Sequence, residues 1–464
     1  MTMTSDVQGT RDRIAAALKT ATDDSALAAA LADVRAADIA GCFELLSEAD
    51  RSRILYALPA RTTAEIVVLL ADAIRGDVVE ELGTKSLTEL VSELPPDDAA
   101  DMLGDMPEDE AGEILEHMVA AKSEPIEELL EYDKTTAGGI MTPEVVAIPA
   151  SLTVADAVEY VRRATQNDEL HEVYIVDDDK RPIGTVALRR LVTGAPHTVL
   201  RDISEPDPVV VLASDDQETV VQIIRKYDAS EAGVVDSAGR LIGRITHDDL
   251  LDVADEEAEE DILRMAGTDP AELDTTSALR AAIVRLTWLL PCIAGTLVSA
   301  TSLAVGQRHF DVALFATLAL FIPMIGATAG NAGIQISTVI VRGFATGEYS
   351  FTKLRLVIPR EGRVALALAP VCGLTAWVLV SVAFPFFVWL NGPGQYAAPY
   401  RVAYAVGLAM TVAILVAACL GVALPFTFRK IGVDPAISSG PIVTTTNDAV
   451  CVTIYMLTAM AIAR

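Results

Sequence analysis

The stretch SSGPIVTTTNDAVCVTIYMLTAMAIA, residues 438–463, is apolar over a length that can cross a lipid bilayer, yet it contains the acidic residue Asp448. A membrane-spanning helix needs about 20 mainly apolar residues. Four more stretches meet this requirement, near residues 282–306, 312–341, 363–390 and 399–424. We therefore expect residues 279–464 to form a transmembrane domain of five α-helices, in contact with membrane lipid.

The basic residues around these five stretches alternate between frequent and rare along the chain. They are frequent before the first stretch, after the second and after the fourth, and they are rare after the first and the third. Loops rich in Lys and Arg remain in the cytoplasm. The alternation predicts a multi-pass protein of the cell membrane with a cytoplasmic N-terminus and a C-terminus outside.

Acidic residues are concentrated in the other part of the chain. The 464 residues include 35 Lys and Arg and 65 Asp and Glu, for a formal net charge of -30, and only seven of the acidic residues follow residue 270. An acidic surface attracts cations and repels nucleic acid, so no nucleic-acid partner is expected. Adaptation of a soluble surface to salt would produce the same composition.

Residues 1–135 predict an all-α domain. Apolar residues recur at helical spacing in segments such as CFELLSEADRSRILYALP (42–59) and AEIVVLLADAI (64–74). Several segments end at a Leu-Pro or Met-Pro pair, which is typical of a helix end. Units of roughly 10–20 residues favour a superhelical stack, and their irregular spacing leaves a compact bundle as the alternative.

Residues 136–253 contain an internal repeat. YIVDDDKRPIGTVALRRL begins at Tyr174, and GVVDSAGRLIGRITHDDL begins 59 residues later at Gly233. Each copy has a strand before a helix, followed by two strands and a second helix. The repeat predicts a tandem α+β pair related by pseudo-symmetry.

The segment LLDVADEEAEEDILRMAG, residues 250–267, has the pattern of an acidic helix that leads toward the membrane domain. We place this connecting helix at residues 254–278. The spacing of Glu257, Glu260 and Asp261 puts three carboxylates on one helix face. A solvated acidic helix would have the same sequence pattern.

Asp448 needs an explanation because a carboxylate at bilayer depth is costly and usually faces a water-filled path or a partner. Its stretch contains no Lys or Arg, which favours an ion path. Oxygen ligands suit hard cations such as Mg2+, and threonines together with carbonyls freed by Gly440-Pro441 would supply more of them. A protonated, hydrogen-bonded structural aspartate is the alternative.

Two membrane segments carry a resemblance to a known family. PMIGATAGNAGIQIS (323–337) and GPIVTTTNDAVCVTIYM (440–456) resemble signature segments of the MgtE family of magnesium channels and transporters, and the internal repeat resembles a tandem CBS pair. The order of the segments also matches that family: helical N domain, CBS pair, connecting "plug" helix and five transmembrane helices. The resemblance implies a homodimer with the pore at the dimer interface.

The resemblance also implies roles for individual residues. Cys451 stands where many members have Gly, which concerns helix packing near the pore. The residues expected to form or support the ion path are Asp448, Thr444, Thr445, Asn447, Gly330, Asn331, Ala332 and Gly333. The expected metal ligands are Asp448 in the pore and, for regulatory Mg2+, Asp97, Asp98, Asp101, Asp228, Asp249, Asp252, Glu257, Glu260 and Asp261.

Some members of the family bind ATP between the CBS copies. An aromatic residue there follows a Tyr-Asp pair, whereas Tyr227-Asp228 is followed by Ala229 in this sequence. The acidic residue that contacts ribose is replaced by Arg190. Both departures count against ATP as a cofactor of this chain.

The resemblance implies a magnesium-selective channel or transporter, not an enzyme, that cytoplasmic Mg2+ closes by bridging acidic residues. The sequence contains no GxxxxGK[ST] motif, so we expect ions to move down their gradient. A broader divalent-cation transporter or a coupled exchanger is one alternative. A membrane-anchored metal sensor that transports nothing is another, although a sensor has no use for Asp448.

Overall fold

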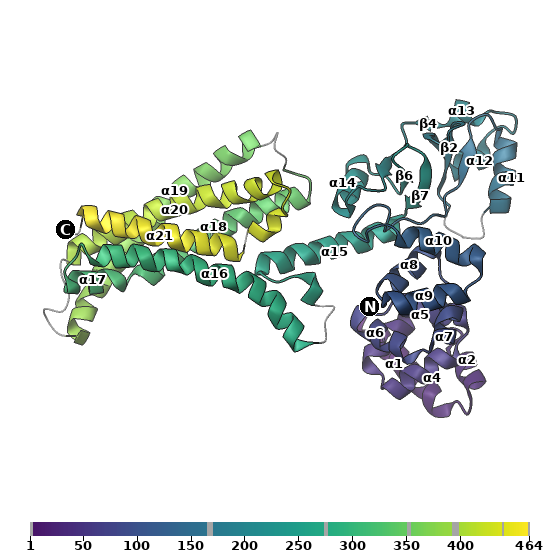
Figure 1. The fold of residues 1–464 in the computed structure, drawn as a ribbon, viewed down its shortest axis with the longest axis horizontal. Coiled ribbons are helices and arrows are strands. Elements are labelled where there is room, and N and C mark those ends of the chain that lie inside the picture. Colours follow the sequence, from purple (N-terminus) through teal and green to yellow (C-terminus); the bar gives the residue numbers. More distant parts are fainter. Residues whose placement is uncertain are drawn as a thin grey trace. The chain divides into compact units, whose positions relative to one another are not determined.

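The structure is a computed structural model that describes residues 3–164, 170–272, 277–349, 354–391, 399–438 and 440–462. The chain divides into two compact units, Met1–Asp255 and Glu256–Arg464. Figure 1 labels many of the elements of both units, and each unit is described by itself.

The first unit begins with short helices joined by short turns. Pro59, Pro95 and Pro107 stand at the N-caps of three of them, because proline cannot continue the preceding helix. Helix α3 packs on α5, α5 on α7 and α7 on α9, a next-but-one pattern that makes a superhelical stack and not a compact bundle. The helices are α1 (Met3–Thr20), α2 (Asp24–Leu31), α3 (Ala36–Ala40), α4 (Glu48–Ala57), α5 (Ala60–Val68), α6 (Asp72–Glu81), α7 (Thr84–Val91), α8 (Pro96–Gly104), α9 (Glu108–His117) and α10 (Ala120–Leu130).

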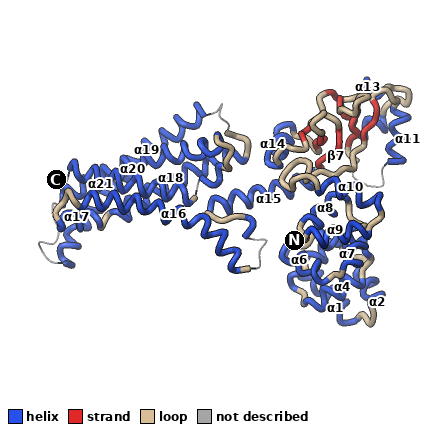
Figure 2. Tube along the Cα trace, in the orientation of Figure 1, coloured by secondary structure: helices blue, strands red, loops and turns tan. Residues whose placement is uncertain are grey.

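The rest of the first unit contains two small sheets, drawn in red in Figure 2. Each copy of the repeat has the three predicted strands, and they form a parallel pair extended by an antiparallel strand. The first copy comprises β1 (Ala147–Pro149), α11 (Val154–Ala164), β2 (Glu172–Val176), β3 (Pro182–Ala187), α12 (Leu188–Thr193), α13 (Leu200–Ile203) and β4 (Glu205–Pro206). The second comprises β5 (Val210–Leu212), α14 (Gln217–Tyr227), β6 (Ala232–Val235) and β7 (Leu241–Ile245).

The two copies meet at residues that are equivalent in the repeat. Tyr174 on β2 is 1% exposed, and a Cβ placed on Gly233 of β6 would lie 2.9 Å from the Tyr174 ring. Tyr174, Val176, Val235 and Leu241 form a small apolar cluster at this contact. The missing side chain at Gly233 therefore lets the large ring of one copy pack on the backbone of the other.

Helix α15 (His247–Ala266) follows β7 directly, so the boundary predicted at residue 253 falls inside it. Asp249 Oδ2 accepts a hydrogen bond from the backbone N–H of Thr246 at 3.2 Å, as the N3 side chain of a capping box does. Gly267, with φ +83°, follows the helix, as is usual where a helix ends. A short 3-10 helix, η2 (Pro270–Glu272), comes next.

The second unit contains five candidate membrane spans, which confirms the predicted number for the part of the chain that the structure describes. Its helices are α16 (Ala278–Gln307), α17 (Val312–Ala319), α18 (Ile322–Ala345), α19 (Leu354–Asn391), α20 (Pro399–Lys430), the 3-10 helix η4 (Pro435–Ser438) and α21 (Pro441–Ile462). The second predicted stretch forms two helices, α17 and α18, and Pro323 lies in the first turn of α18, where a proline is tolerated.

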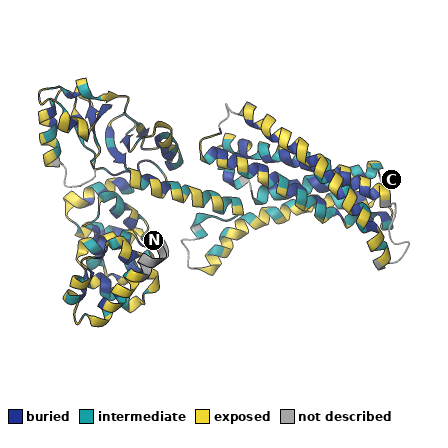
Figure 3. Ribbon diagram, turned by 180° about the vertical axis from the view of Figure 1, so that it is seen from behind, coloured by how far each residue is buried: buried dark blue, intermediate teal, exposed yellow. Residues whose placement is uncertain are grey.

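Small residues let the membrane helices approach closely. A Cβ on Gly373 of α19 would lie 2.6 Å from the carbonyl oxygen of Gly407 on α20, and a Cβ on Gly295 of α16 would lie 2.1 Å from the methyl of Thr445 on α21. Large apolar side chains on α16, such as Leu289 (55%) and Leu297 (66%), remain exposed, as the yellow residues in Figure 3 illustrate. This pattern, small residues inside and large ones outside, is typical of helices in lipid.

Candidate ion path and acidic clusters

Asp448 lies on α21, which begins at Pro441. The expectation that Gly440-Pro441 frees backbone carbonyls is wrong. The hydroxyls of Thr444 and Thr445 donate hydrogen bonds to the carbonyl oxygens of Gly440 (3.1 Å) and Pro441 (2.8 Å). Gly440-Pro441 marks the start of the helix, and the threonines bind its first-turn carbonyls.

The Asp448 side chain faces a cavity of about 430 Å³ between α16, α18 and α21. Of the predicted ion-path residues, Thr444, Gly330 and Asn331 line this cavity together with Asp448. A Cβ on Gly326 would lie 3.4 Å from Asp448 Oδ1, so the glycine leaves room for the carboxylate. The cavity therefore brings a carboxylate, a hydroxyl and an amide to one space inside the membrane unit.

The other predicted ion-path residues lie away from the cavity wall, in helix contacts. Asn447 is 0% exposed, and a Cβ on Gly333 would lie 2.0 Å from its Nδ2 atom. Neither polar atom of the Asn447 amide has a hydrogen-bond partner in the part of the chain that the structure describes. Asn447 and Gly333 therefore form a tight contact between α21 and α18, as Thr445 and Gly295 do between α21 and α16.

Two polar residues of α16 line the cavity and were missed by the sequence reasoning. They are Thr296 and Ser299. The hydroxyl of Ser299 is buried without a hydrogen-bond partner among the described residues. A signal exists in the sequence, because Gly295, Ser299, Ser302 and Gly306 recur at spacings of four, three and four, which places small residues on one helix face.

The first acidic cluster lies inside the first unit, where Asp97, Asp98 and Asp101 of α8 approach Asp249 of α15. Burial, followed by the charge of Asp249, raises the pKa of Asp97 to about 6. Burial, followed by the charges of Asp97 and Asp249, raises the pKa of Asp98 to about 7. Burial and Asp97 raise the pKa of Asp101 to about 6. The structure thus brings together four of the predicted ligands.

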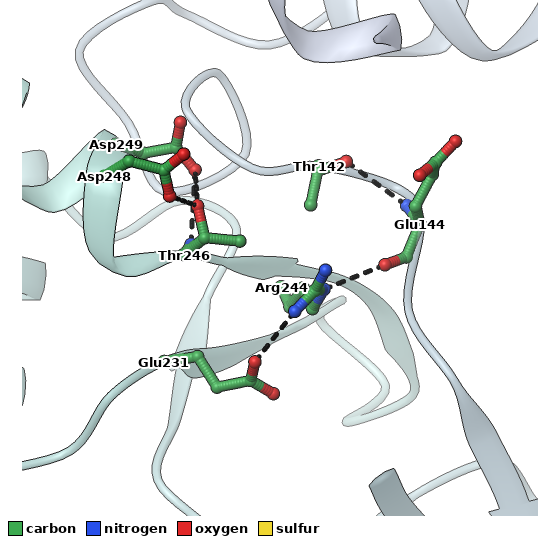
Figure 4. Close-up of polar contacts among 7 residues, drawn as sticks. All are labelled: Thr142, Glu144, Glu231, Arg244, Thr246, Asp248 and Asp249. Atoms are coloured by element: carbon green, nitrogen blue, oxygen red, sulfur yellow. Dashed lines mark hydrogen bonds and ion pairs between the residues drawn. The ribbon is translucent and has the colours of Figure 1, made fainter. Parts of the chain in front are cut away.

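Polar contacts fix the surroundings of Asp249, as Figure 4 shows. The Thr246 hydroxyl donates to Asp249 Oδ2 at 2.5 Å. Two residues earlier on β7, Arg244 pairs with the buried Glu231 at 2.8 Å and donates from Nε to the carbonyl oxygen of Glu144 at 2.9 Å. Arg244 therefore ties the segment that enters the repeat to the strand that leads into α15. Asp248 and Glu144, which add negative charge here, were not predicted.

The second acidic cluster lies inside the second unit and joins α15 to the loop between α20 and η4. Burial and then the charge of Asp434 raise the pKa of Asp261 to about 6, and burial raises the pKa of Glu260. Arg264 forms ion pairs with both Glu260 and Asp434. Asp434 and Arg264 were not predicted, because they approach only through the fold.

Of the remaining predicted ligands, Asp252 adjoins the first cluster, where its charge raises the pKa of Asp249, and Asp228 lies elsewhere. Asp228 is exposed at the C-cap of α14 in the left-handed region, with φ 52°. The pKa of Asp252 is raised by burial and by the charge of Asp248. Among the described residues, no group of three or more His, Cys, Asp or Glu side chains is arranged to hold a metal ion. Ionised carboxylates that are partly buried and close together are unfavourable, because they lose hydration and repel one another. A bound cation would offset that cost.

Three family models match the chain. They are the MgtE intracellular N domain at residues 34–135, the CBS domain at 137–195 and 200–256, and the MgtE divalent cation transporter domain at 322–458. The chain is 36% identical over 331 residues to the magnesium transporter MgtE of Enterococcus faecalis, covering 71% of this chain and 70% of that protein. The chain belongs to the MgtE family of magnesium transporters.

Further comparisons with MgtE proteins agree. The magnesium transporter MgtE of Thermus thermophilus is 34% identical over 340 residues, which is 72% of this chain and 71% of that protein. A crystal structure of the cytosolic domain of the Mg2+ channel MgtE in complex with ATP matches with a TM-score of 0.50 and 30% identity, covering 52% of this chain and 99% of that one. The predicted MgtE architecture, with a helical N domain, a CBS pair and a transmembrane domain, is thereby confirmed.

Proposed function

We propose that this chain forms a homodimeric, Mg2+-selective pathway through the cell membrane, which cytoplasmic Mg2+ closes. The observation that carries the proposal is Asp448 on the wall of a cavity between three membrane helices, in a stretch without Lys or Arg. A carboxylate there attracts a divalent cation, and Mg2+ is commonly bound by one or two carboxylates with waters retained. Thr444 and Asn331 add polar atoms for those waters.

A second copy of the chain completes the pathway in this proposal. Each copy supplies one carboxylate, so two copies would place two around a common axis. The most apolar part of α16 has no buried residue in the single chain. A helix that lines the cavity and is otherwise exposed supports an additional contact with a partner.

The acidic clusters support closure by cytoplasmic Mg2+. Raised pKa values at Asp97, Asp98, Asp101 and Asp261 mean that ionised carboxylates oppose the arrangement seen here. A divalent cation that bridges them favours it, whereas its removal lets the charges separate. Mg2+ at Asp97, Asp98, Asp101, Asp249 and Asp252 would then hold α8 against α15, and Mg2+ at Glu257, Glu260 and Asp261 would hold α15 against the membrane domain.

The orientation follows from the basic residues at helix ends. Arg342 lies in the last turn of α18, and Arg429 and Lys430 lie in the last turn of α20. These ends are cytoplasmic by the positive-inside rule, so the N-terminus is cytoplasmic and the C-terminus lies outside.

ATP has no role in this proposal, although a related cytosolic domain was crystallised with ATP. Arg190, where the family carries an acidic residue, pairs with Glu205 at 2.9 Å and donates to the carbonyl oxygen of Ile203 at 3.1 Å. A cation engaged in this way offers no acceptor for a ribose hydroxyl. ATP is therefore expected to leave the Mg2+ dependence of closure unchanged.

Transport by the purified protein tests the proposal. Proteoliposomes should take up Mg2+ without an imposed proton or sodium gradient, and Mg2+ on the cytoplasmic face should stop the uptake. Dependence on such a gradient would indicate a coupled exchanger. Equal uptake of Mn2+, Co2+ and Ca2+ would indicate a general divalent pathway, and no uptake, with Mg2+ still protecting the chain from proteolysis, would indicate a sensor.

A further inference from the structure

The last turn of α15 and the start of α21 touch through their backbones in the second unit. A Cβ on Gly440 would lie 2.2 Å from the carbonyl oxygen of Met265, and a Cβ on Gly267 would lie 2.5 Å from Pro441 Cγ. Only glycine fits at these two positions without displacement. The end of α15 is therefore placed directly against the helix that carries Asp448.

Arg264 holds this junction by charge. Its guanidinium pairs with Glu260, one turn earlier on α15, and with Asp434 Oδ2 at 2.5 Å in the loop after α20. The side chains of Arg264, Glu260 and Asp434 are 29%, 23% and 26% exposed, so water screens the contacts only in part. Charge-assisted hydrogen bonds of this kind are stronger than neutral ones.

Asp434 contacts both Arg264 and the segment that precedes α21. Its Oδ1 atom accepts a hydrogen bond from the backbone N–H of Ala436 at 2.8 Å and so fixes the first turn of η4. The short helix η4, Pro435–Ser438, ends close before α21 in the sequence. One carboxylate thus joins Arg264 of α15 to the segment that precedes α21.

The charges around Arg264 explain why a cation is needed there. Glu257, Glu260, Asp261 and Asp434 bring four carboxylates to this side of α15, and the charges of Asp434, Glu257 and Glu260 raise the pKa of Asp261. Like charges at this range repel, which would separate α15 from the loop. Arg264 offsets part of that repulsion permanently, whereas Mg2+ can offset it only when bound.

We propose that Arg264 is a positioning residue, a built-in cation that holds the end of α15 against the segment before α21 without any bound metal. The inference rests on the proposed function in one respect, that α15 in this position closes the pathway. Arg264 then keeps a fraction of the molecules closed when cytoplasmic Mg2+ is absent. It limits the basal Mg2+ leak, and bound Mg2+ strengthens a contact that already exists.

The test is the initial rate of Mg2+ uptake by proteoliposomes of the full chain with a chelator on the cytoplasmic face, where no divalent cation can compete. Arg264→Gln should raise this rate about three- to tenfold, the effect of losing roughly 1 kcal/mol of ion pairing. Arg264→Lys should restore most of the wild-type rate. Lys430→Gln removes a positive charge from the last turn of α20, where the described residues show no ion pair with Lys430, and should have no effect.

A double-mutant cycle separates the ion pair from a general structural effect. Asp434→Asn keeps an oxygen that can accept from Ala436 but removes the negative partner of Arg264. In the Asp434→Asn background, Arg264→Gln should therefore raise the rate by a smaller factor than it does in the wild type, because the ion pair between the two residues is already lost.

Three results would overturn the inference: a wild-type rate for Arg264→Gln, a lower rate, or single-variant effects that multiply in the double variant. Failure of the proposed function would look different, since the wild-type protein itself would then show no Mg2+ uptake or no closure by Mg2+.

Discussion

At the scale of single residues, the aspartates of α8 make the stability of the protein depend on pH. The pKa of Asp98 is raised from 3.8 to about 7 by burial and by the negative charges of Asp97 and Asp249. The native state therefore retains a proton that the unfolded chain releases at lower pH. The resulting stability is fully present below the unfolded pKa and is lost as the pH rises through about 7. In the proposed function, a proton and Mg2+ compete for the same carboxylates.

We predict that the chelator-treated protein loses thermal stability between about pH 5 and about pH 8, and that Mg2+ restores it at the higher pH. Asp98→Asn removes the charge and should stabilise the metal-free protein at pH 8 by about 1–2 kcal/mol, a value reduced for the partial exposure of the group. Thermal unfolding of the detergent-solubilised chain measures both effects. A pH profile of Asp98→Asn identical to wild type would contradict the cluster's role.

At the scale of elements, the contact between α18 and α21 separates packing from ion binding. Gly333 is buried against Asn447, whereas Gly330, one turn earlier on α18, lines the cavity. A Cβ on Gly330 would meet no atom within 4 Å among the described residues. Two glycines of one motif therefore have different roles, which their sequence context alone does not distinguish.

We predict that Gly333→Ala destabilises the membrane domain by about 1–3 kcal/mol, because the new methyl group overlaps the Asn447 amide. Gly330→Ala should leave stability unchanged but slow Mg2+ uptake, because the methyl group enters the cavity. Thermal unfolding in detergent and uptake by proteoliposomes, measured on both variants, distinguish the two effects. Equal loss of stability in both variants would show that Gly330 also supports packing.

The helices and strands were predictable where the sequence has a clear pattern of apolar residues or an internal repeat. Long apolar runs predict the five spans, and the repeat with an offset of 59 residues predicts the CBS pair. Both signals are visible in the sequence because burial in lipid or in a sheet requires apolar residues at regular positions. The helix ends were less predictable. Helix α19 starts at Leu354 and α20 continues to Lys430, so arginines placed in loops by the sequence reasoning belong to helices. Long basic side chains can reach the interface from a helical turn.

The parts of the site that were missed depend on tertiary contacts. Asp434 is one acidic residue in a short loop, and it becomes notable only beside Arg264 and Asp261. Ser299 resembles any small residue of a membrane helix until the cavity is known. Asp448 was predictable because one carboxylate in an apolar run is unusual by itself.

At the scale of the whole molecule, the proposed function links the acidic clusters of α8 and α15 to an ion path that contains a carboxylate. This function requires that Mg2+ passes Asp448. Asp311 provides a matched control, because it is another aspartate of the membrane unit but caps α17 by accepting from Leu314 N–H at 2.8 Å. Asp311→Ser removes that charge and keeps a capping side chain.

The most direct measurement is the initial rate of Mg2+ uptake by proteoliposomes that contain wild type, Asp448→Ala or Asp311→Ser at equal protein content. We predict that Asp448→Ala reduces uptake to the level of empty liposomes, whereas Asp311→Ser transports like wild type. Mg2+ should still protect Asp448→Ala from proteolysis, which shows that the protein is folded. Wild-type uptake by Asp448→Ala, or an equal loss in Asp311→Ser, would contradict the assignment of Asp448 to the ion path.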